Sequence, residues 1–223
     1  MLPPWRSPLS GALHRNRSEP FSRYFQLATV TPEGYPSNRT VVFRGFLEGD
    51  RSSLKIITDI RSAKIQDIER QAMGEICWYF TKTREQFRIQ GVLRLVKAQD
   101  QDADLLKARK ITWQKISDAA RSQFAWATPG QPVMGERKKD AETRGRGDGS
   151  NGNPTQNFVH PPAIDKSAFD VEPPDPHLPL DTFCLLLLVP KKVDHLQLRG
   201  DPQQRCIYQL ATDTTWSSQL VNP

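Results

Sequence analysis

Hydrophobic positions along the chain fall mostly in short runs that alternate with polar residues, which is the pattern of half-buried β-strands. The first two runs are separated by Pro32-Glu33-Gly34, and the fourth and fifth are joined by a short polar link, so each pair predicts a hairpin. A last extended piece is expected around Trp216. The predicted strands cover residues 22–30, 37–47, 54–59, 74–81, 86–98, 182–189, 192–198 and 205–211.

A few segments carry helical patterns instead. A short helix near the N-terminus can be capped by Ser7 or Ser10, and a helix over 62–71 follows the third strand with Ser62 at its N-cap. Residues 103–122 have an apolar stripe at helical spacing, which is usually core. Because short strands outnumber helices, we expect a mainly β protein: a closed antiparallel β-barrel with flanking helices.

The composition changes between about residues 129 and 179, where Gly, Pro, Asn, Lys and Asp dominate. A compact domain does not bury such a segment, so we expect a flexible insertion at 131–179. The total length of 223 residues fits one ordinary domain. The prediction is therefore a single domain, 1–223, with this insertion.

Charge and cysteine content restrict the partners and the compartment. Lys and Arg outnumber Asp and Glu by 31 to 25, which allows an anionic partner such as nucleic acid, a membrane or a phosphorylated ligand. The cysteines Cys77, Cys184 and Cys206 are far apart and lack metal-ligand spacing, so we expect free thiols in a reducing compartment and no metal site. No secretory signal is recognised, and the longest apolar run, 183–189, is too short to cross a bilayer. A cytoplasmic protein without membrane contact is expected.

The stretch KIITDIRSAK, residues 55–64, runs from a strand into the start of a helix, which is a natural anion site. Thr58 and Ser62 offer hydroxyl groups, and Lys64 offers a positive charge. Together with Arg39 on the preceding hairpin, this is the chemistry of a phosphate clamp. A capped helix with ordinary basic residues explains the stretch about equally well.

Two further pairs of polar residues have less specific spacing. Arg39 and Arg44 are five residues apart on one strand, so they point to opposite faces unless a bulge intervenes. Gln86 and Arg88 are two apart and share a face of the fifth strand, where either can place a donor at a polar ring edge. Ordinary surface positions would look the same.

Several runs together resemble the FMN-binding split barrels of the pyridoxamine 5'-phosphate oxidase superfamily, in the branch found in cyanobacteria and plants. These runs are FQLATVTPEGYPSNRTVVFRGF, LKIITDIRSAKIQDIE, ICWYFTKTREQFRIQGVLRLV and RSQFAWATPG. The resemblance covers residues 1–130 well and the C-terminal strands more loosely. It implies FMN as the cofactor and a homodimer with FMN in the cleft between the subunits.

The resemblance also implies which residues contact the cofactor. One chain would supply Arg39, Thr58 and Lys64, and the other would largely supply Gln86 and Arg205. No separate catalytic acid or base is implied, because FMN carries the redox chemistry. The full set of implied FMN-binding residues is Arg39, Val41, Val42, Arg44, Thr58, Ser62, Lys64, Gln86 and Arg205.

Near the flavin, the chain departs from the oxidase pattern at two positions. Ala63 stands where the family has an arginine after the serine of the clamp, and Arg61 is placed to supply the lost charge from the other side. A family tryptophan near the flavin falls close to His195 or Leu196.

The substrate side departs further. Arg44 and Ser122 keep positions at which the family binds the substrate phosphate. An acid at such a position repels a phosphate, so activity on pyridoxamine phosphate does not follow from FMN binding. The positions that depart from the family are Gln114, Asp118, Asp201 and Gln203.

The favoured function is an FMN-dependent oxidoreductase of the pyridoxamine/pyridoxine 5'-phosphate oxidase type in pyridoxal phosphate metabolism. Its partner would be a small-molecule substrate, for which the resemblance suggests a phosphorylated B6 vitamer. One alternative is a non-catalytic FMN-binding or flavin-delivery module, and another is a flavin-dependent reductase of a different small substrate. A nucleic-acid binder is not expected, because part of the basic charge lies in the insertion.

Overall fold

The computed structural model describes residues 2–50, 52–132 and 169–223, so most of the insertion expected at 131–179 lies outside the described residues. The helical elements of the described part are α1 (Arg6–Arg15), α2 (Lys64–Arg70), α3 (Ala103–Lys115), α4 (Asp118–Ser122) and the short 3-10 helix Gln123–Ala125. The strands are β1 (Tyr24–Val30), β2 (Pro36–Val42), β3 (Leu54–Asp59), β4 (Met73–Phe80), β5 (Glu85–Val96), β6 (Phe183–Gln197), β7 (Gln204–Leu210) and β8 (Trp216–Val221).

The strands form one antiparallel sheet in the order β2-β1-β4-β5-β6-β7-β8, with β3 also paired to β6. Both predicted hairpins, β1–β2 and β4–β5, are confirmed. The chain after β2 then closes onto β3: Arg44 N donates to Lys55 O, and Lys55 N donates to Gly45 O, each at 2.8 Å. This closure confirms the mainly β barrel with flanking helices.

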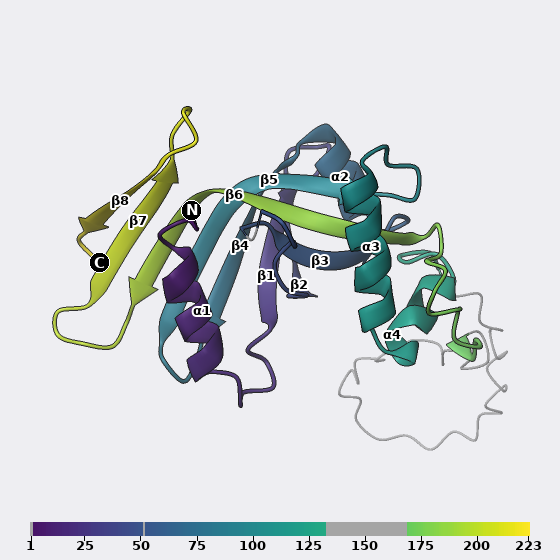
Figure 1. Ribbon diagram of the computed structural model, residues 1–223, viewed down its shortest axis with the longest axis horizontal. Coiled ribbons are helices and arrows are strands. Elements are labelled where there is room, and N and C mark those ends of the chain that lie inside the picture. The colour runs from purple at the N-terminus through teal and green to yellow at the C-terminus, as the bar shows by residue number, and fades with distance from the viewer. Residues whose placement is uncertain (1, 51, 133–168) are drawn as a thin grey trace, which may run out of the picture.

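The long strand β6 belongs to both parts of the sheet. β5 lies along one edge of β6, whereas the other edge pairs with β3 over residues 183–188 and with β7 over residues 192–197. As a result, the β7–β8 hairpin extends away from the barrel, at the left of Figure 1. The β7–β8 hairpin therefore lies outside the barrel, on the same edge of β6 that pairs with β3.

Sequence reasoning divided β6 at Pro190, and this was wrong. The strand continues through a bulge, because Gln90 pairs with Lys192 while Gly91 pairs with Pro190. A bulge tolerates proline, which has no N–H to donate to a ladder. Gly91 is required at this point, since a Cβ atom there would lie 2.1 Å from the carbonyl oxygen of Val189.

The expected helix caps also need correction. Ser7 and Ser10 lie inside α1 rather than at its start, and the N-cap residue is Trp5, which makes no side-chain cap hydrogen bond. Ser62 is not the N-cap of α2, because Ala63 occupies that position.

The single helix expected over 103–122 is broken in two. Ile116 has extended backbone angles, with φ −84° and ψ 154°, and this ends α3. The side chain of Ser117 then caps α4 by accepting a hydrogen bond from Ala120 N. A serine after the apolar stripe was therefore the signal of a second helix start.

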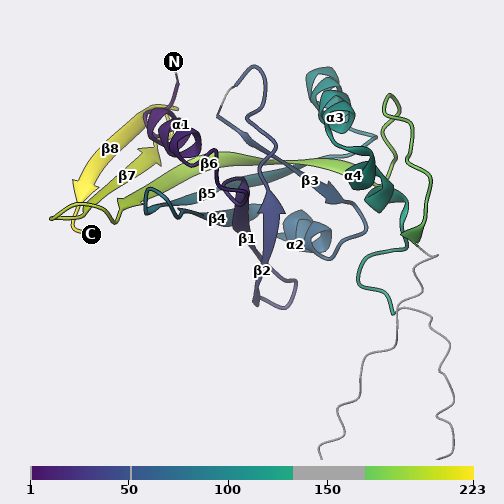
Figure 2. The same ribbon diagram turned by 90° about the horizontal axis from the view of Figure 1, so that it is seen from below.

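The helices cover both sides of the long strands. Figure 2 shows α1 and α3 on one side of β5 and β6, with α2 on the other. The main core includes Trp5, which precedes α1, and Leu9 of α1, together with Trp78, Phe80 and Phe87 of the sheet. No helix among the described residues is long and apolar enough to span a membrane.

Candidate cofactor site

A cleft of about 540 Å³ opens beside β2 and β3, a volume in the usual range for small-molecule sites. Its other wall comes from α4 and the segment after it, including Gln123, Phe124 and Trp126. We call it the clamp cleft. It gathers the following residues predicted to bind a cofactor: Arg39, Val41, Val42, Arg44, Thr58, Ser62 and Lys64.

At the junction of β3 and α2, three polar side chains converge, as the sequence predicted. Lys64 Nζ donates to Thr58 Oγ1 at 3.0 Å and to Ser62 Oγ at 2.9 Å, and the two hydroxyl oxygens lie 3.2 Å apart. Ser62 Oγ also donates to the carbonyl of Asp59 at 2.7 Å. We call Thr58, Ser62 and Lys64 the clamp.

Asp67, a buried acid that sequence reasoning missed, helps to orient Arg39. The Arg39 guanidinium donates to Thr29 Oγ1 and to Ser37 Oγ, each at 2.6 Å, and lies 3.4 Å from Asp67 Oδ2. Thr29 also donates to Asp67 at 2.7 Å, so the acid connects β1, β2 and α2. Asp67 is buried along with Ile65 and Ile68, but helical spacing does not place it on their face, so no local pattern in the sequence marked it.

The charges around the clamp favour an anionic ligand. Burial lowers the pKa of Lys64, and the nearby charge of Arg39 lowers it further, while Asp59 and Asp67 act in the opposite direction. Two cations that repel each other in a partly buried site are both stabilised when a phosphate binds between them.

Two buried donors in the cleft also fit a ligand with acceptor groups. Burial lowers the pKa of Arg44. Among the described residues, neither Arg44 Nε nor Trp126 Nε1 has a hydrogen-bond partner. An unpaired buried donor costs about 1–3 kcal/mol, so an acceptor within reach is expected to bind it. The residues present therefore fit a phosphorylated cofactor with a polar ring system.

Val41 and Val42 lie where backbone groups are available. β2 is the terminal strand of the described sheet and pairs only with β1 before the chain closes onto β3. One edge of a terminal strand offers unpaired N–H and C=O groups. Both valines are half-buried and line the cleft.

Arg61 does not replace the positive charge of the family arginine whose position Ala63 occupies. Its guanidinium binds both carboxylate oxygens of Asp59, at 2.9 and 2.6 Å. It also donates to the carbonyl oxygens of Trp126 and Phe124. Arg61 therefore attaches the far wall of the clamp cleft to the end of β3.

Gln86 and Arg205 do not line the clamp cleft of their own chain. The strand register places Tyr79, Gln86, Leu196 and Arg205 side by side on four neighbouring strands, and we call them the outer row. Successive side chains of a strand point to opposite faces. Leu196, not His195, is therefore the residue on the same face as Gln86 and Arg205.

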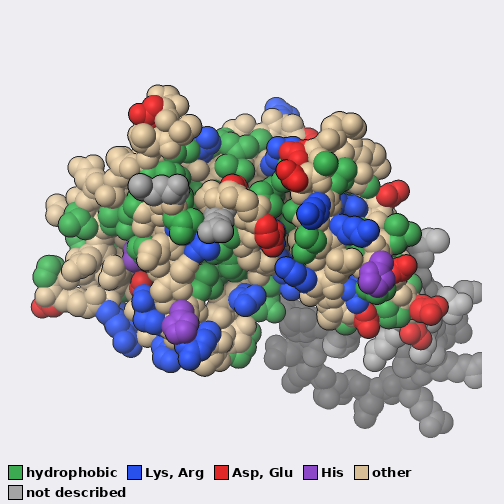
Figure 3. Space-filling view, in the orientation of Figure 1, with side chains coloured by type: hydrophobic (Ala, Val, Ile, Leu, Met, Phe, Trp, Pro, Cys, Tyr) green, Lys and Arg blue, Asp and Glu red, His purple; other side chains and the backbone are tan. Residues whose placement is uncertain are grey.

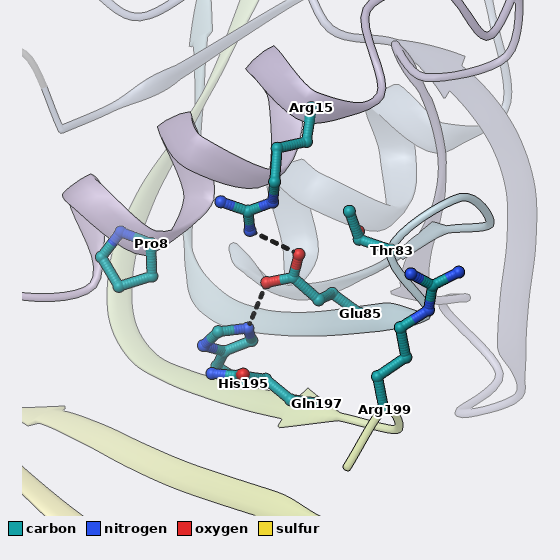
Figure 4. A pocket seen from close by; sticks show the side chains of 7 residues that line it. All are labelled: Pro8, Arg15, Thr83, Glu85, His195, Gln197 and Arg199. Carbon is teal, nitrogen blue, oxygen red and sulfur yellow. Dashed lines mark hydrogen bonds and ion pairs between the residues drawn. The ribbon is translucent and has the colours of Figure 1, made fainter.

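His195 points into a second cavity of about 550 Å³ beneath α1 (Figure 4). In this cavity Glu85 accepts hydrogen bonds from Arg15 of α1 at 2.6 Å and from His195 at 3.0 Å. On the face seen in Figure 3, Lys and Arg side chains gather near the C-terminal end of α1. Because the carboxylate of Glu85 lies at the centre of this cavity and would repel a phosphate, the clamp cleft is the better cofactor site.

The pKa of Glu85 reflects the hydrogen bonds and the charge that surround its carboxylate in this second cavity. Burial alone would raise it, but hydrogen bonds from His195, Arg15 and Thr83 and the charge of Arg15 outweigh burial and lower it to about 2. His195 also stacks on Phe87, with ring centroids 4.0 Å apart. The arrangement attaches α1 to β5 and β6.

The positions at which the resemblance puts ligands of the substrate phosphate or of its ring are either engaged with other residues or exposed. Ser122 is buried and donates to the carbonyl of Asp118 at 3.1 Å. The carboxylate of Asp118 pairs with Arg121, and Gln114 contacts His177. Asp201 and Gln203 are exposed residues between β6 and β7.

Comparison with known proteins shows similarity in sequence over the described part of the chain and beyond. A family model described as pyridoxamine 5'-phosphate oxidase, FMN-binding domain, matches residues 2–97. The chain is 36% identical to pyridoxine/pyridoxamine 5'-phosphate oxidase 2 of Arabidopsis thaliana, over 99% of this chain and 97% of that protein.

Two solved structures are similar over almost the whole chain. A pyridoxamine 5'-phosphate oxidase-related, FMN-binding protein of Nostoc punctiforme is 48% identical, with a TM-score of 0.83 and full coverage of both chains. PhzG from Burkholderia lata has a TM-score of 0.65 at 14% identity, covering 97% of this chain and 91% of that one. The second likeness concerns the fold alone.

Proposed function

The chain belongs to the pyridoxamine 5'-phosphate oxidase family and carries its FMN-binding domain, and from this premise we propose that the clamp cleft holds FMN in an oxidoreductase. The observation that carries the proposal is the convergence of Lys64 on the hydroxyls of Thr58 and Ser62, beside Arg39. When bound, FMN would supply the redox chemistry as the acceptor of one hydride, and hence of two electrons, from the substrate.

In this proposal, the clamp and Arg39 bind the phosphate of the cofactor. The hydroxyls of Thr58 and Ser62 can turn their protons toward phosphate oxygens, and the ammonium of Lys64 balances the charge. Asp67 Oδ2, 3.4 Å from Arg39 Nη2, helps to hold the guanidinium in place. Val41 and Val42 would offer backbone groups to the ring.

A second protomer would complete the site. Gln86 and Arg205 lie together in the outer row, away from the clamp cleft of their own chain. The same row contains Tyr79, which is 42% exposed in the single chain. An exposed aromatic residue beside polar ligands is typical of a protein interface. We therefore propose a homodimer in which each protomer contributes its outer row to its partner's cleft.

The substrate is proposed to be a small molecule bound between the flavin and the Arg44–Trp126 side of the cleft. The printed names of the relatives suggest phosphorylated forms of pyridoxine and pyridoxamine. One observation favours a second candidate, a flavoprotein without that activity: Asp118 and Gln114 occupy positions where the resemblance expects phosphate ligands, and both contact other residues. The free thiols of Cys77, Cys184 and Cys206 support a cytoplasmic location.

The first experiment measures FMN binding to the full chain by visible absorption and by quenching of flavin fluorescence. We expect the wild type to bind FMN, and the double variant Arg39→Ala/Lys64→Ala to lose at least about a hundredfold in affinity, because two charge-assisted contacts of about 1.5–3 kcal/mol each are removed. Lys110→Ala, at an exposed position on α3, is the matched control.

Turnover is then tested with pyridoxamine 5'-phosphate and with pyridoxine 5'-phosphate as substrates. Oxygen consumption is the readout. Oxidation of either vitamer supports the oxidase. FMN binding without turnover supports the flavoprotein candidate. A wild type that ignores added FMN contradicts the proposed cofactor site.

A further inference from the structure

A buried carboxylate lies between two arginines on the outer face of the sheet. Asp194 of β6 accepts hydrogen bonds from Arg205 Nε at 3.0 Å and from Arg205 Nη2 at 2.8 Å. Its Oδ2 also accepts from Arg88 of β5. The Asp194 side chain is 8% exposed, whereas those of Arg88 and Arg205 are 44% and 31% exposed.

The contact fixes one edge of the Arg205 guanidinium and leaves the other available. Nε and Nη2 bind the two carboxylate oxygens as a fork, which strongly limits the rotation of the side chain. Among the described residues, Arg205 Nη1 makes no hydrogen bond. Burial alone would raise the pKa of Asp194, but the two arginines outweigh burial and lower it, so the carboxylate stays ionised at neutral pH.

The position of Asp194 links it to the proposed cofactor. Its neighbours in the register, Arg88 and Ile207, form the row of side chains next to the outer row, which contains Gln86 and Arg205. Two arginines around one carboxylate leave a net positive charge at this place. A dianionic ligand approaching from the partner protomer would therefore be attracted.

We propose that Asp194 is a positioning residue, which holds Arg205 in the orientation that meets the FMN bound in the partner's clamp cleft. Arg88 supplies the second counter-charge that keeps the buried carboxylate ionised. This role rests on the proposed function. Because Arg205 is oriented before the ligand arrives, less conformational entropy is lost when FMN binds.

A purely structural role is the competing explanation, since the same contacts join β5, β6 and β7. The two roles differ in how substitutions combine. If Asp194 acts through Arg205, its removal changes nothing further once Arg205 is gone. A structural contribution would persist in the absence of Arg205.

The test is a double-mutant cycle on FMN affinity in the full chain: wild type, Asp194→Asn, Arg205→Gln and the double variant. We expect each single substitution to weaken FMN binding about tenfold, the effect of losing one charge-assisted contact, and the double variant to match Arg205→Gln alone. Glu75→Gln is the matched control, because this carboxylate lies on the same face of the sheet and accepts from Gln90 rather than from an arginine.

Sedimentation and thermal unfolding of each variant accompany the cycle. If Asp194→Asn does not fold, Asp194→Glu takes its place in the cycle, because it keeps the charge and displaces the guanidinium by one methylene. Unchanged FMN affinity in the Asp194 variant overturns the positioning role, and so do effects that multiply in the double variant. A wild type that binds no FMN overturns the proposed function itself, whereas binding that depends on Lys64 but not on Asp194 overturns only this inference.

Discussion

At the scale of single residues, the candidate site depends on side chains whose partners are distant in sequence. Arg39 contacts Thr29 and Asp67, and the charge of Arg39 lowers the pKa of Lys64. The type of each residue predicted a phosphate clamp. The affinity of this clamp for a phosphate depends on burial, because burial lowers the pKa of Lys64 and so makes the charge of Lys64 sensitive to pH.

The lowered pKa of Lys64 predicts how FMN affinity changes with pH. Lys64 is positive below its pKa, so affinity for the phosphate should fall as pH rises through that value, which lies below the usual value of 10.5. Fluorescence titrations between about pH 7 and pH 10 measure this. Riboflavin, which lacks the phosphate, should bind without this dependence, and Lys64→Arg should remove it. An equal fall for riboflavin would contradict the role of Lys64.

At the scale of elements, the long strand β6 decides how the two halves of the sheet are joined. It pairs with β3 in its first part and with β7 in its second, and the bulge at Pro190 and Gly91 lies between these parts. Sequence reasoning treated Pro190 as the end of a strand. A local pattern does not show that β6 can carry one extra residue opposite Gln90 and Gly91 and continue its pairing with β5.

The bulge predicts that Gly91→Ala destabilises the fold. The new Cβ would meet Val189 O at 2.1 Å and Pro190 Cα at 3.0 Å, so the backbone of β6 has to move. A loss of about 1–3 kcal/mol in the free energy of unfolding is expected, measured by urea denaturation. Gly11→Ala is the control, because its Cβ would meet only the guanidinium end of the half-exposed Arg15 side chain, which can move. An equal loss in both variants would contradict this account of the bulge.

At the scale of the whole molecule, α1 is attached to the sheet at two places. Trp5 lies in the core beside Trp216 of β8, with ring centroids 5.9 Å apart. Arg15 reaches Glu85, which also binds His195 of β6 (Figure 4). This second attachment depends on an ionised carboxylate and therefore on pH.

The pKa of Glu85 predicts an acid-dependent part of the stability. It is about 2 in the folded protein, below the ordinary value of 4.5, so between these values the unfolded chain binds more protons. The contribution of Glu85 is therefore complete above about pH 4.5 and disappears as pH falls toward 2. Glu85→Gln should unfold at lower urea than the wild type at pH 7, and the gap should shrink at pH 3. Glu33→Gln, at an exposed turn, is the control; a gap that grows in acid would contradict the prediction.

The sequence by itself determined the strands other than the unbroken course of β6, both hairpins and the residue types of the clamp. Strand alternation and turn residues are local signals, readable without tertiary contacts. The stretch 55–64 could be singled out for the same reason, since a strand that ends at a helix start brings Thr58, Ser62 and Lys64 together.

Only the tertiary structure decided which partners those residues have. It turned Arg61 toward Asp59, placed Leu196 rather than His195 beside Gln86, and brought Asp194 between two arginines. Each outcome depends on which strands pair and in what register, and a shift of one residue moves every side chain to the opposite face. Contacts between segments more than a hundred residues apart, such as Arg88 and Asp194, leave no local pattern in the sequence.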